Sequence, residues 1–316
     1  MARRKSHRRP HGQTPFERGQ ARNPGFEPGR ADGRADIGQA LGGERDSDAE
    51  RTRSERIQPE RGTSARRGGG FWLHGVHPVL AALANPERRC LRLVATPEAA
   101  KSWAGKLDPL LAARRGLGFE RLERAALDRL LPPGAIHQGL ALEVEPLAEP
   151  TIDEILRAAG AREDATLLVL DQVTDPHNVG AILRSASAFG ALAVVLTERH
   201  APGASATLAK AASGAAESVP LVRVTNLARA LDEIKAAGLW CAGLDAEAPQ
   251  TLAEARLDGR VALVLGAEGE GLRRLTRERC DLLVRIPMAP GAVASLNVSN
   301  AAAVALYELY RTRAKG

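Results

Sequence analysis

The strongest constraint on the fold is a series of six short apolar segments in the second half of the chain. They lie at 166–172, 192–197, 220–224, 239–243, 260–265 and 282–287. Helical patterns alternate with them, and helices are predicted at 178–189, 205–213, 226–237, 273–279 and 296–313. Almost uninterrupted apolar strands joined by helices are typical of a parallel sheet with helices on both faces. Ligands of such α/β sheets bind beyond the carboxyl ends of the strands. Three loops there stand out, at 171–178, 265–272 and 287–297.

A smaller α/β pattern precedes this region. Helices are predicted at 76–84, 97–114 and 125–131, and strands at 90–95, 118–122 and 139–145. The segment "PLAEPT" at 146–151 carries two prolines and is typical of a linker. The predicted domains are therefore a small α/β module at 71–146 and a larger α/β domain at 151–316.

The first 70 residues differ in composition from the rest. They contain 16 Lys or Arg and 10 Asp or Glu, whereas the remaining chain has 28 of each. With almost no aliphatic residues, this segment cannot bury enough apolar surface to fold, so a disordered basic tail is predicted. Arginine-rich disorder favours polyanion binding, with RNA the obvious candidate, although a solubilising extension without a partner has the same composition.

The sequence shows neither a targeting segment nor a metal-type spacing of residues, which predicts a cytoplasmic protein without a resident metal. No apolar run is long enough for a signal peptide or a membrane span, and the ten acidic residues of the tail argue against a mitochondrial transit peptide. Cys90, Cys241 and Cys280 lack metal-type spacing and are predicted to be reduced and buried. The seven histidines form no cluster. No metal and no membrane partner are expected.

The stretch "DPHNVGAILRSASAFG" at 175–190 leaves the role of one arginine open. Val179, Ile182, Ala186 and Phe189 recur at helical spacing and are predicted to face a core. Arg184 lies about 200° around the helix from Ile182, so it points away from that core. It is either a solvated surface residue or a residue that acts on a ligand.

The loop "LGAEGEGL" at 265–272 is glycine-rich, but it does not match a dinucleotide fingerprint. The order is G-x-x-G-x-G, after a late strand, and no acidic residue follows about 20 residues on. Its glycines allow a close approach of the backbone to a flat ligand. Glu268 and Glu270 would repel a phosphate, so a ligand with an amino group, a cation or ribose hydroxyls suits the loop better. A tight glycine turn without a ligand is the alternative.

The third loop, "IPMAPGAVASLNVSN", leads into the last helix. Ser295 is predicted to cap that helix. The helix carries two apolar stripes, one of Val298, Ala302, Ala305 and Leu309, and another of Ala303, Leu306, Tyr307 and Tyr310. A terminal helix that is apolar on two sides is expected to pack on its own sheet and on a second subunit.

Together, "DPHNVGAILRSASAFG", "LGAEGEGLRRLT" and "IPM…SLNVSNAAAVALYE" resemble, in order and spacing, the three motifs of the SpoU/TrmH family of SPOUT RNA 2′-O-ribose methyltransferases. The resemblance covers about 71–316. The connecting stretch "SGAAESVPLVRVTNLARAL" is similar to the branch that modifies a guanosine of 23S rRNA. Likewise "HGVHPVLAAL" and "IHQGLAL" resemble the ribosomal-protein-like RNA-binding domain of that branch.

The resemblance implies features that the pattern alone does not predict. An unknotted doubly wound sheet is the general expectation, whereas this family forms a trefoil knot around an S-adenosyl-L-methionine site, with two subunits building each active site. The implied roles fall on five catalytic residues, which are Asn178, Arg184, Glu268, Ser295 and Asn297. The implied cofactor-binding residues are Leu265, Gly266, Glu268, Gly269, Ile286, Met288, Ser295 and Leu296.

The implied role of Arg184 has two versions. Arginine stays protonated and is a poor base, yet the family's mechanisms assign it to activating the 2′-hydroxyl. Clamping the substrate phosphate is the other version, and the sequence does not decide between them. The loop "PMAPGAVASLN" departs from the family pattern by one extra residue, Pro290.

The expected function is therefore S-adenosylmethionine-dependent 2′-O-methylation of a guanosine in 23S rRNA by a homodimer built through the C-terminal helix. A tRNA 2′-O-methyltransferase of the same fold is one alternative. A non-catalytic RNA-binding or ribosome-assembly protein is another, against which the intact set of five catalytic positions argues. The nucleotide that is modified and the role of the tail do not follow from the sequence.

Overall fold

Two β-sheets organise the part of the chain that the structure describes. In this computed structural model, the described residues are 70–200, 206–289, 291 and 295–314. The predicted basic tail, apart from Gly70, and the additional Pro290 lie outside them.

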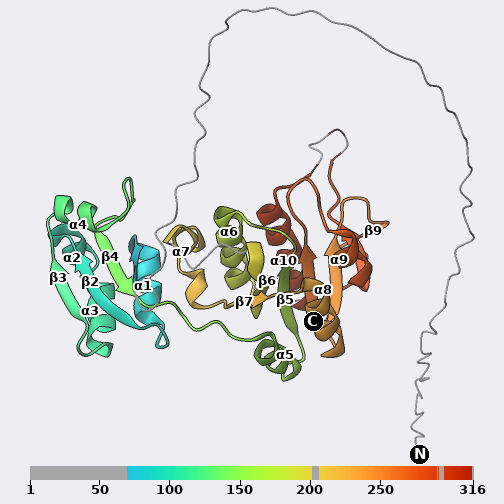
Figure 1. Ribbon diagram of the computed structural model, residues 1–316, viewed down its shortest axis with the longest axis horizontal. Helices are drawn as coiled ribbons and strands as arrows, with labels where there is room; N and C mark the ends of the chain where they lie inside the picture. The colour runs from blue at the N-terminus through green and yellow to red at the C-terminus, as the bar shows by residue number, and fades with distance from the viewer. Residues whose placement is uncertain (1–69, 201–205, 290, 292–294, 315–316) are drawn as a thin grey trace, which may run out of the picture. The chain divides into compact units, whose positions relative to one another are not determined.

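The first sheet has four strands in the order β1-β4-β2-β3 (blue to green in Figure 1). β4 pairs antiparallel with β1 and β2, whereas β2 and β3 are parallel. Buried leucines and valines of the strands pack against α1 and α3 to form its core. Its elements are β1 (Phe71–His74), α1 (Val76–Ala84), β2 (Cys90–Ala95), α2 (Pro97–Ser102), α3 (Ala104–Ala113), β3 (Gly118–Arg121), α4 (Arg124–Leu130) and β4 (Leu140–Val144).

The second sheet has seven strands, all parallel, in the order β7-β6-β5-β10-β8-β11-β9. Its strands are β5 (Ala165–Leu170), β6 (Ala193–Thr197), β7 (Leu221–Val224), β8 (Trp240–Leu244), β9 (Gln250–Thr251), β10 (Arg260–Leu265) and β11 (Leu282–Arg285). Its helices are α5 (Ile152–Gly160), α6 (Pro176–Ala188), α7 (Ala206–Ala212), α8 (Leu227–Ala236), α9 (Arg274–Arg279) and α10 (Val298–Arg313), with short 3₁₀ turns at Glu198–His200 and Ala215–Glu217. The predicted parallel α/β sheet is confirmed.

Helices cover both faces of this sheet, as predicted. Strand residues alternate between two cores: Leu168 and Leu170 pack with α6, α7 and α10, whereas Leu167 and Val169 pack with α5 and α8 (Figure 1). This alternation follows from the two-residue period of a strand. Every residue of β5 is buried, and all of them except Thr166 are apolar.

Three features differ from the sequence-based expectation. The single helix predicted at 97–114 is wrong, because the chain leaves the helical conformation at Trp103, whose φ is −107° and ψ is 8°, and starts a new helix. The prediction missed α5, which a capping box of Thr151 and Glu154 starts directly after the prolines. It also missed the two edge strands β1 and β9, which are only four and two residues long.

None of the helices in the described residues is long and apolar enough to span a lipid bilayer.

Candidate active site

The three loops predicted from the sequence meet at the carboxyl end of the large sheet, and Asn297 joins them. β5 and β10 are neighbours, and β11 lies one strand beyond β8. The Asn297 side-chain amide donates to Asn178 Oδ1 (3.0 Å) and to Glu268 Oε1 (2.7 Å). Three candidate catalytic residues from three distant segments are therefore in direct contact.

The orientation of the Asn297 amide is fixed by the start of α10. Its Oδ1 accepts hydrogen bonds from the backbone N–H (2.9 Å) and the hydroxyl (2.6 Å) of Ser299. The NH₂ group must therefore face Asn178 and Glu268. The predicted cap was wrong: Asn297, not Ser295, caps this helix, which begins at Val298. Ser295 is exposed and lies three residues before the helix.

The glycine-rich loop requires a glycine at position 266. A Cβ on Gly266 would lie 2.0 Å from the backbone carbon of Gly271, because the loop folds back on itself through a hydrogen bond from Gly271 N to Ala267 O. The end of the loop is held by the fully buried Asp171, which follows β5 directly. Its carboxylate accepts from the backbone N–H (3.0 Å) and Nε (2.6 Å) of Arg273.

A cavity of about 420 Å³ lies under this loop. Its volume is within the range of small-molecule sites. All eight residues predicted to bind a cofactor line it, namely Leu265, Gly266, Glu268, Gly269, Ile286, Met288, Ser295 and Leu296. The structure thus brings them together around one space, and their roles toward a ligand remain predictions.

Sequence reasoning missed an ion pair in the same cavity wall. Asp245, directly after β8, and Arg277, on α9, both line the cavity and form an ion pair of 2.7 Å. The available signal was the position of Asp245 at the carboxyl end of a strand that neighbours β10.

Arg184 stands apart from the three residues in contact. As predicted, Val179, Ile182 and Ala186 on the same helix are buried, and Arg184 is exposed. Within the described residues it has no hydrogen bond or ion pair, and none joins it to Asn178, Glu268 or Asn297.

The C-terminal helix has one buried and one exposed apolar face. Val298, Ala302, Ala305 and Leu309 pack into the core beside α6, as predicted. Leu306 was assigned to the second stripe, but it is buried in the same core. The exposed face instead consists of Val304, Tyr307 and Tyr310, which are 43%, 52% and 51% exposed. Both tyrosine rings contact Phe189 of the segment after α6, with centroids 5.9 and 5.8 Å away.

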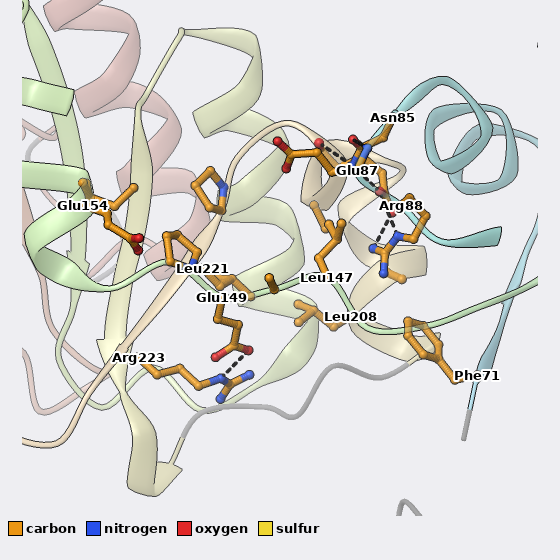
Figure 2. Close-up of a pocket in the computed structure, with 17 residues that line it drawn as sticks. Phe71, Asn85, Glu87, Arg88, Leu147, Glu149, Glu154, Leu208, Leu221 and Arg223 are labelled. Atoms are coloured by element: carbon orange, nitrogen blue, oxygen red, sulfur yellow. Dashed lines mark hydrogen bonds and ion pairs between the residues drawn. The ribbon is translucent and has the colours of Figure 1, made fainter. Parts of the chain in front are cut away.

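A second cavity, of about 520 Å³, lies elsewhere and is lined by none of the predicted site residues (Figure 2). Four of its charged groups form two ion pairs. Arg88 donates to both carboxylate oxygens of Glu217 (2.7 and 3.0 Å), which also accepts from Asn85 (3.0 Å), and Arg223 pairs with Glu149 (2.8 Å). The stretch around Glu217, which carried the resemblance to one branch of the family, therefore binds the segment that follows α1.

The cysteines and the acidic groups of the described residues offer no nucleophile or metal cluster. Burial raises the pKa of the Cys241 and Cys280 thiols to about 12 and also raises the pKa of Cys90. These thiols are therefore neutral at physiological pH, and all three are free. No group of three or more His, Cys, Asp or Glu side chains in the described part of the chain could hold a metal ion.

Two known protein families match this chain, one in each of the two α/β regions. Residues 165–307 match the SpoU rRNA Methylase family, and residues 72–150 match the family described as RNA 2′-O ribose methyltransferase substrate binding.

Curated relatives match most of the chain and nearly all of their own length. The 23S rRNA (guanosine-2′-O-)-methyltransferase RlmB of Escherichia coli K12 is 43% identical over 244 residues, covering 76% of this chain and 98% of the relative. The protein of the same name from Photobacterium profundum is 44% identical over 246 residues, covering 76% and 97%.

Solved structures show the same fold. The SpoU methyltransferase AviRb of Streptomyces viridochromogenes, crystallised with the cofactor AdoMet, superposes with a TM-score of 0.64 at 28% identity. The match covers 79% of this chain and 92% of AviRb.

Proposed function

The chain belongs to the SpoU rRNA methylase family, and from that premise we propose that it transfers a methyl group from S-adenosyl-L-methionine to the ribose 2′-oxygen of a guanosine in 23S rRNA. The observation that carries the proposal is the contact of Asn297 with Asn178 and Glu268 beside a cavity of cofactor size. The relatives supply the substrate class. Two of them, which the chain matches over nearly their whole length, are named 23S rRNA (guanosine-2′-O-)-methyltransferases.

The cavity suits S-adenosylmethionine by its shape and its polar groups. Gly269 and Gly271, where an added Cβ would meet nothing within 4 Å, leave the loop backbone bare, so a flat adenine ring can approach it closely. Leu265, Ile286 and Leu296 supply apolar walls, and Glu268 and Ser295 supply polar groups. When bound, the cofactor supplies a methyl group on a sulfonium, so that the S–C bond breaks as the bond to the ribose oxygen forms.

The protein must then orient the ribose hydroxyl and assist the departure of its proton. We propose that Asn297, together with the Asn178 and Glu268 side chains to which it donates, orients the ribose hydroxyl, and that Ser295 at the cavity rim shares this role. Arg184 is proposed to hold the adjoining phosphate or to activate the hydroxyl. Because Arg184 does not reach those residues in its own chain, we propose that it serves the site of a second subunit.

The proposed dimer forms through the exposed face of α10. Val304, Tyr307 and Tyr310 leave a contiguous apolar strip on a helix whose other face is already buried. Aromatic residues are enriched at such interfaces.

Tyr307→Arg is expected to convert the dimer into monomers at micromolar concentration. A charge without a partner in an apolar interface costs on the order of several kcal/mol. Light scattering measures the mass of the particle, and Ile136→Arg, at another exposed apolar side chain, is the matched control. A wild-type monomer, or an intact Tyr307→Arg dimer, would count against this interface.

The trefoil knot of the family is also proposed for this chain. The strand order supports it. In the sheet, β8 separates β11 from β10, whereas α10, the helix that follows β11 in the chain, packs against α6 and β10.

We propose that the small module at 71–146, which precedes the methyltransferase domain at 151–316 in the chain, binds RNA. The match to the substrate-binding family supports this role. A ribosomal RNA substrate also implies a cytoplasmic location, which we propose on that ground alone.

Removal of residues 1–70 is expected to lower RNA affinity and to flatten its salt dependence. This segment holds an excess of six basic residues, and the slope of log affinity against log salt should decrease by about 0.7–0.9 for each phosphate contact that is lost. Fluorescence anisotropy with an rRNA fragment at several salt concentrations measures the slope. An unchanged slope would show that the tail does not bind RNA.

The direct test of the activity uses purified protein, labelled S-adenosylmethionine and unmodified RNA. Methyl transfer is expected to 23S rRNA and not to tRNA. Transfer to tRNA alone would identify the tRNA enzyme of the same fold, and binding of rRNA without transfer would identify an assembly protein.

A further inference from the structure

Asp171 is a fully buried acidic residue that lies beside the candidate active site without lining its cavity. It directly follows β5, and its backbone N–H donates to the carbonyl oxygen of Leu265 (2.8 Å), the first residue of the glycine-rich loop at 265–272. Its carboxylate accepts from the backbone N–H (3.0 Å) and from Nε (2.6 Å) of Arg273, which directly follows that loop. One residue therefore holds both ends of the loop.

The chain on the other side of Asp171 leads to a second part of the site. It turns at Gln172, whose φ of 64° is in the left-handed region that residues other than glycine rarely adopt. Such a backbone persists only where the surrounding contacts hold it. The segment that follows carries Asn178, which accepts from Asn297 in the site. Hydrogen bonds of Asp171 thus join the segment of Asn178 to the loop that carries Glu268.

A carboxylate suits this place because it can accept two hydrogen bonds at once and compensates the charge of the guanidinium. The Asp171 side chain is 0% exposed, so a ligand in the cavity does not touch it, whereas Arg273 is half exposed. We infer that Asp171 is a positioning residue, which holds the glycine-rich loop, through Arg273, in the conformation that binds S-adenosylmethionine. This inference rests on the proposed function, because it takes its ligand from there.

Asp171→Asn is the first test, with S-adenosylhomocysteine as the ligand in calorimetry. Asparagine keeps the shape of the side chain but replaces one acceptor oxygen with a donor NH₂ group, so one of the two hydrogen bonds to Arg273 is lost. The loop is then ordered in only a fraction of the molecules, and affinity is expected to fall with that fraction, by about tenfold.

Substitutions of Arg273 test the same contact from its other side. Arg273→Ala removes the Nε donor and is expected to weaken S-adenosylhomocysteine, whereas Arg273→Lys keeps a donor and the charge and should restore part of the affinity. Because the two side chains form one contact, the losses of Asp171→Asn and Arg273→Ala should not multiply in the double variant. Arg274→Ala, at the next residue, which is exposed and pairs with Glu278, should leave the affinity unchanged.

Glu217→Gln separates positioning from stability. Glu217 is another buried carboxylate that accepts two hydrogen bonds from one arginine, Arg88, but it lines the other cavity. This substitution should lower the melting temperature and leave the affinity for S-adenosylhomocysteine unchanged. Asp171→Asn should lower both.

Turnover separates positioning from catalysis. In Asp171→Asn the KM for S-adenosylmethionine should rise, and turnover with this cofactor saturating should approach the wild-type rate, because the bound ligand favours the ordered loop.

Three results would overturn the inference. A lower melting temperature with unchanged affinity would make the pair a structural contact only. Unchanged affinity with a turnover that saturating cofactor does not restore would place Asp171 in the chemical step. If Asp171→Asn does not fold, Arg273→Ala decides, and unchanged affinity there contradicts the positioning role. If the wild-type protein does not bind S-adenosylhomocysteine, the proposed function itself fails.

Discussion

Arg184→Ala is expected to lower turnover by about 100-fold or more while folding and cofactor affinity stay almost intact. An effect of this size accompanies the loss of an electrostatic contact or of help with proton transfer in a transition state. Folding should be insensitive because the side chain is exposed and has no partner in the described residues. Single-turnover methylation, with RNA and cofactor both saturating, measures the effect.

Arg184→Lys distinguishes two possible roles of the guanidinium group. Lysine keeps the charge but loses the planar fork, so bidentate phosphate binding predicts a large loss, whereas a simple point-charge role predicts a small one. Arg229→Ala, at another exposed helix arginine on α8, is the control. Near-normal methylation by Arg184→Ala would make Arg184 an ordinary solvated residue.

Gly266→Ala is expected to abolish cofactor binding in calorimetry. The added methyl group would meet the backbone of Gly271 at 2.0 Å, and backbone cannot move aside as a flexible side chain can. The loop must therefore open, which separates Glu268 from Asn297 and reshapes the cavity. Methylation should fall with cofactor affinity.

Gly105→Ala is the matched control for this substitution. Nothing lies within 4 Å of the added carbon there, and alanine favours the helix in which the residue lies. Wild-type affinity for S-adenosylhomocysteine in Gly266→Ala would show that the loop does not form the cofactor site.

The apolar pattern was sufficient to predict the large sheet and the place of the site. Buried strands such as β5 and β10 are apolar except for Thr166 and Arg260, and the rule that ligands bind at the carboxyl ends of strands then indicates the loops. The contact of Asn178, Glu268 and Asn297 depends on strand order, which hydrophobic periodicity does not encode. Only the resemblance to a family placed these residues in one site.

Local competition explains the errors. Ser295 and Asn297 are both residue types that cap helices well, and residue type alone does not choose between them. Leu306 belongs to the buried face because it lies four residues after Ala302 and three before Leu309, so helical spacing places it on their side of the helix. The pattern Thr151-x-x-Glu154 was visible and predicts α5, so this helix could have been found.

Asp245 escaped for a different reason. An acidic residue after a strand is usually a solvated turn residue, and only the geometry shows that its side chain is buried against Arg277 in the cavity wall.

The central claim is methylation of one ribose in 23S rRNA, and mapping 2′-O-methylation at nucleotide resolution in cells with and without this protein tests it most directly. The account predicts that one guanosine of 23S rRNA loses its methyl group when the protein is absent. The wild-type gene should restore that methyl group, and the Arg184→Ala gene should not. An unchanged 23S rRNA map, or a loss confined to tRNA, would contradict it.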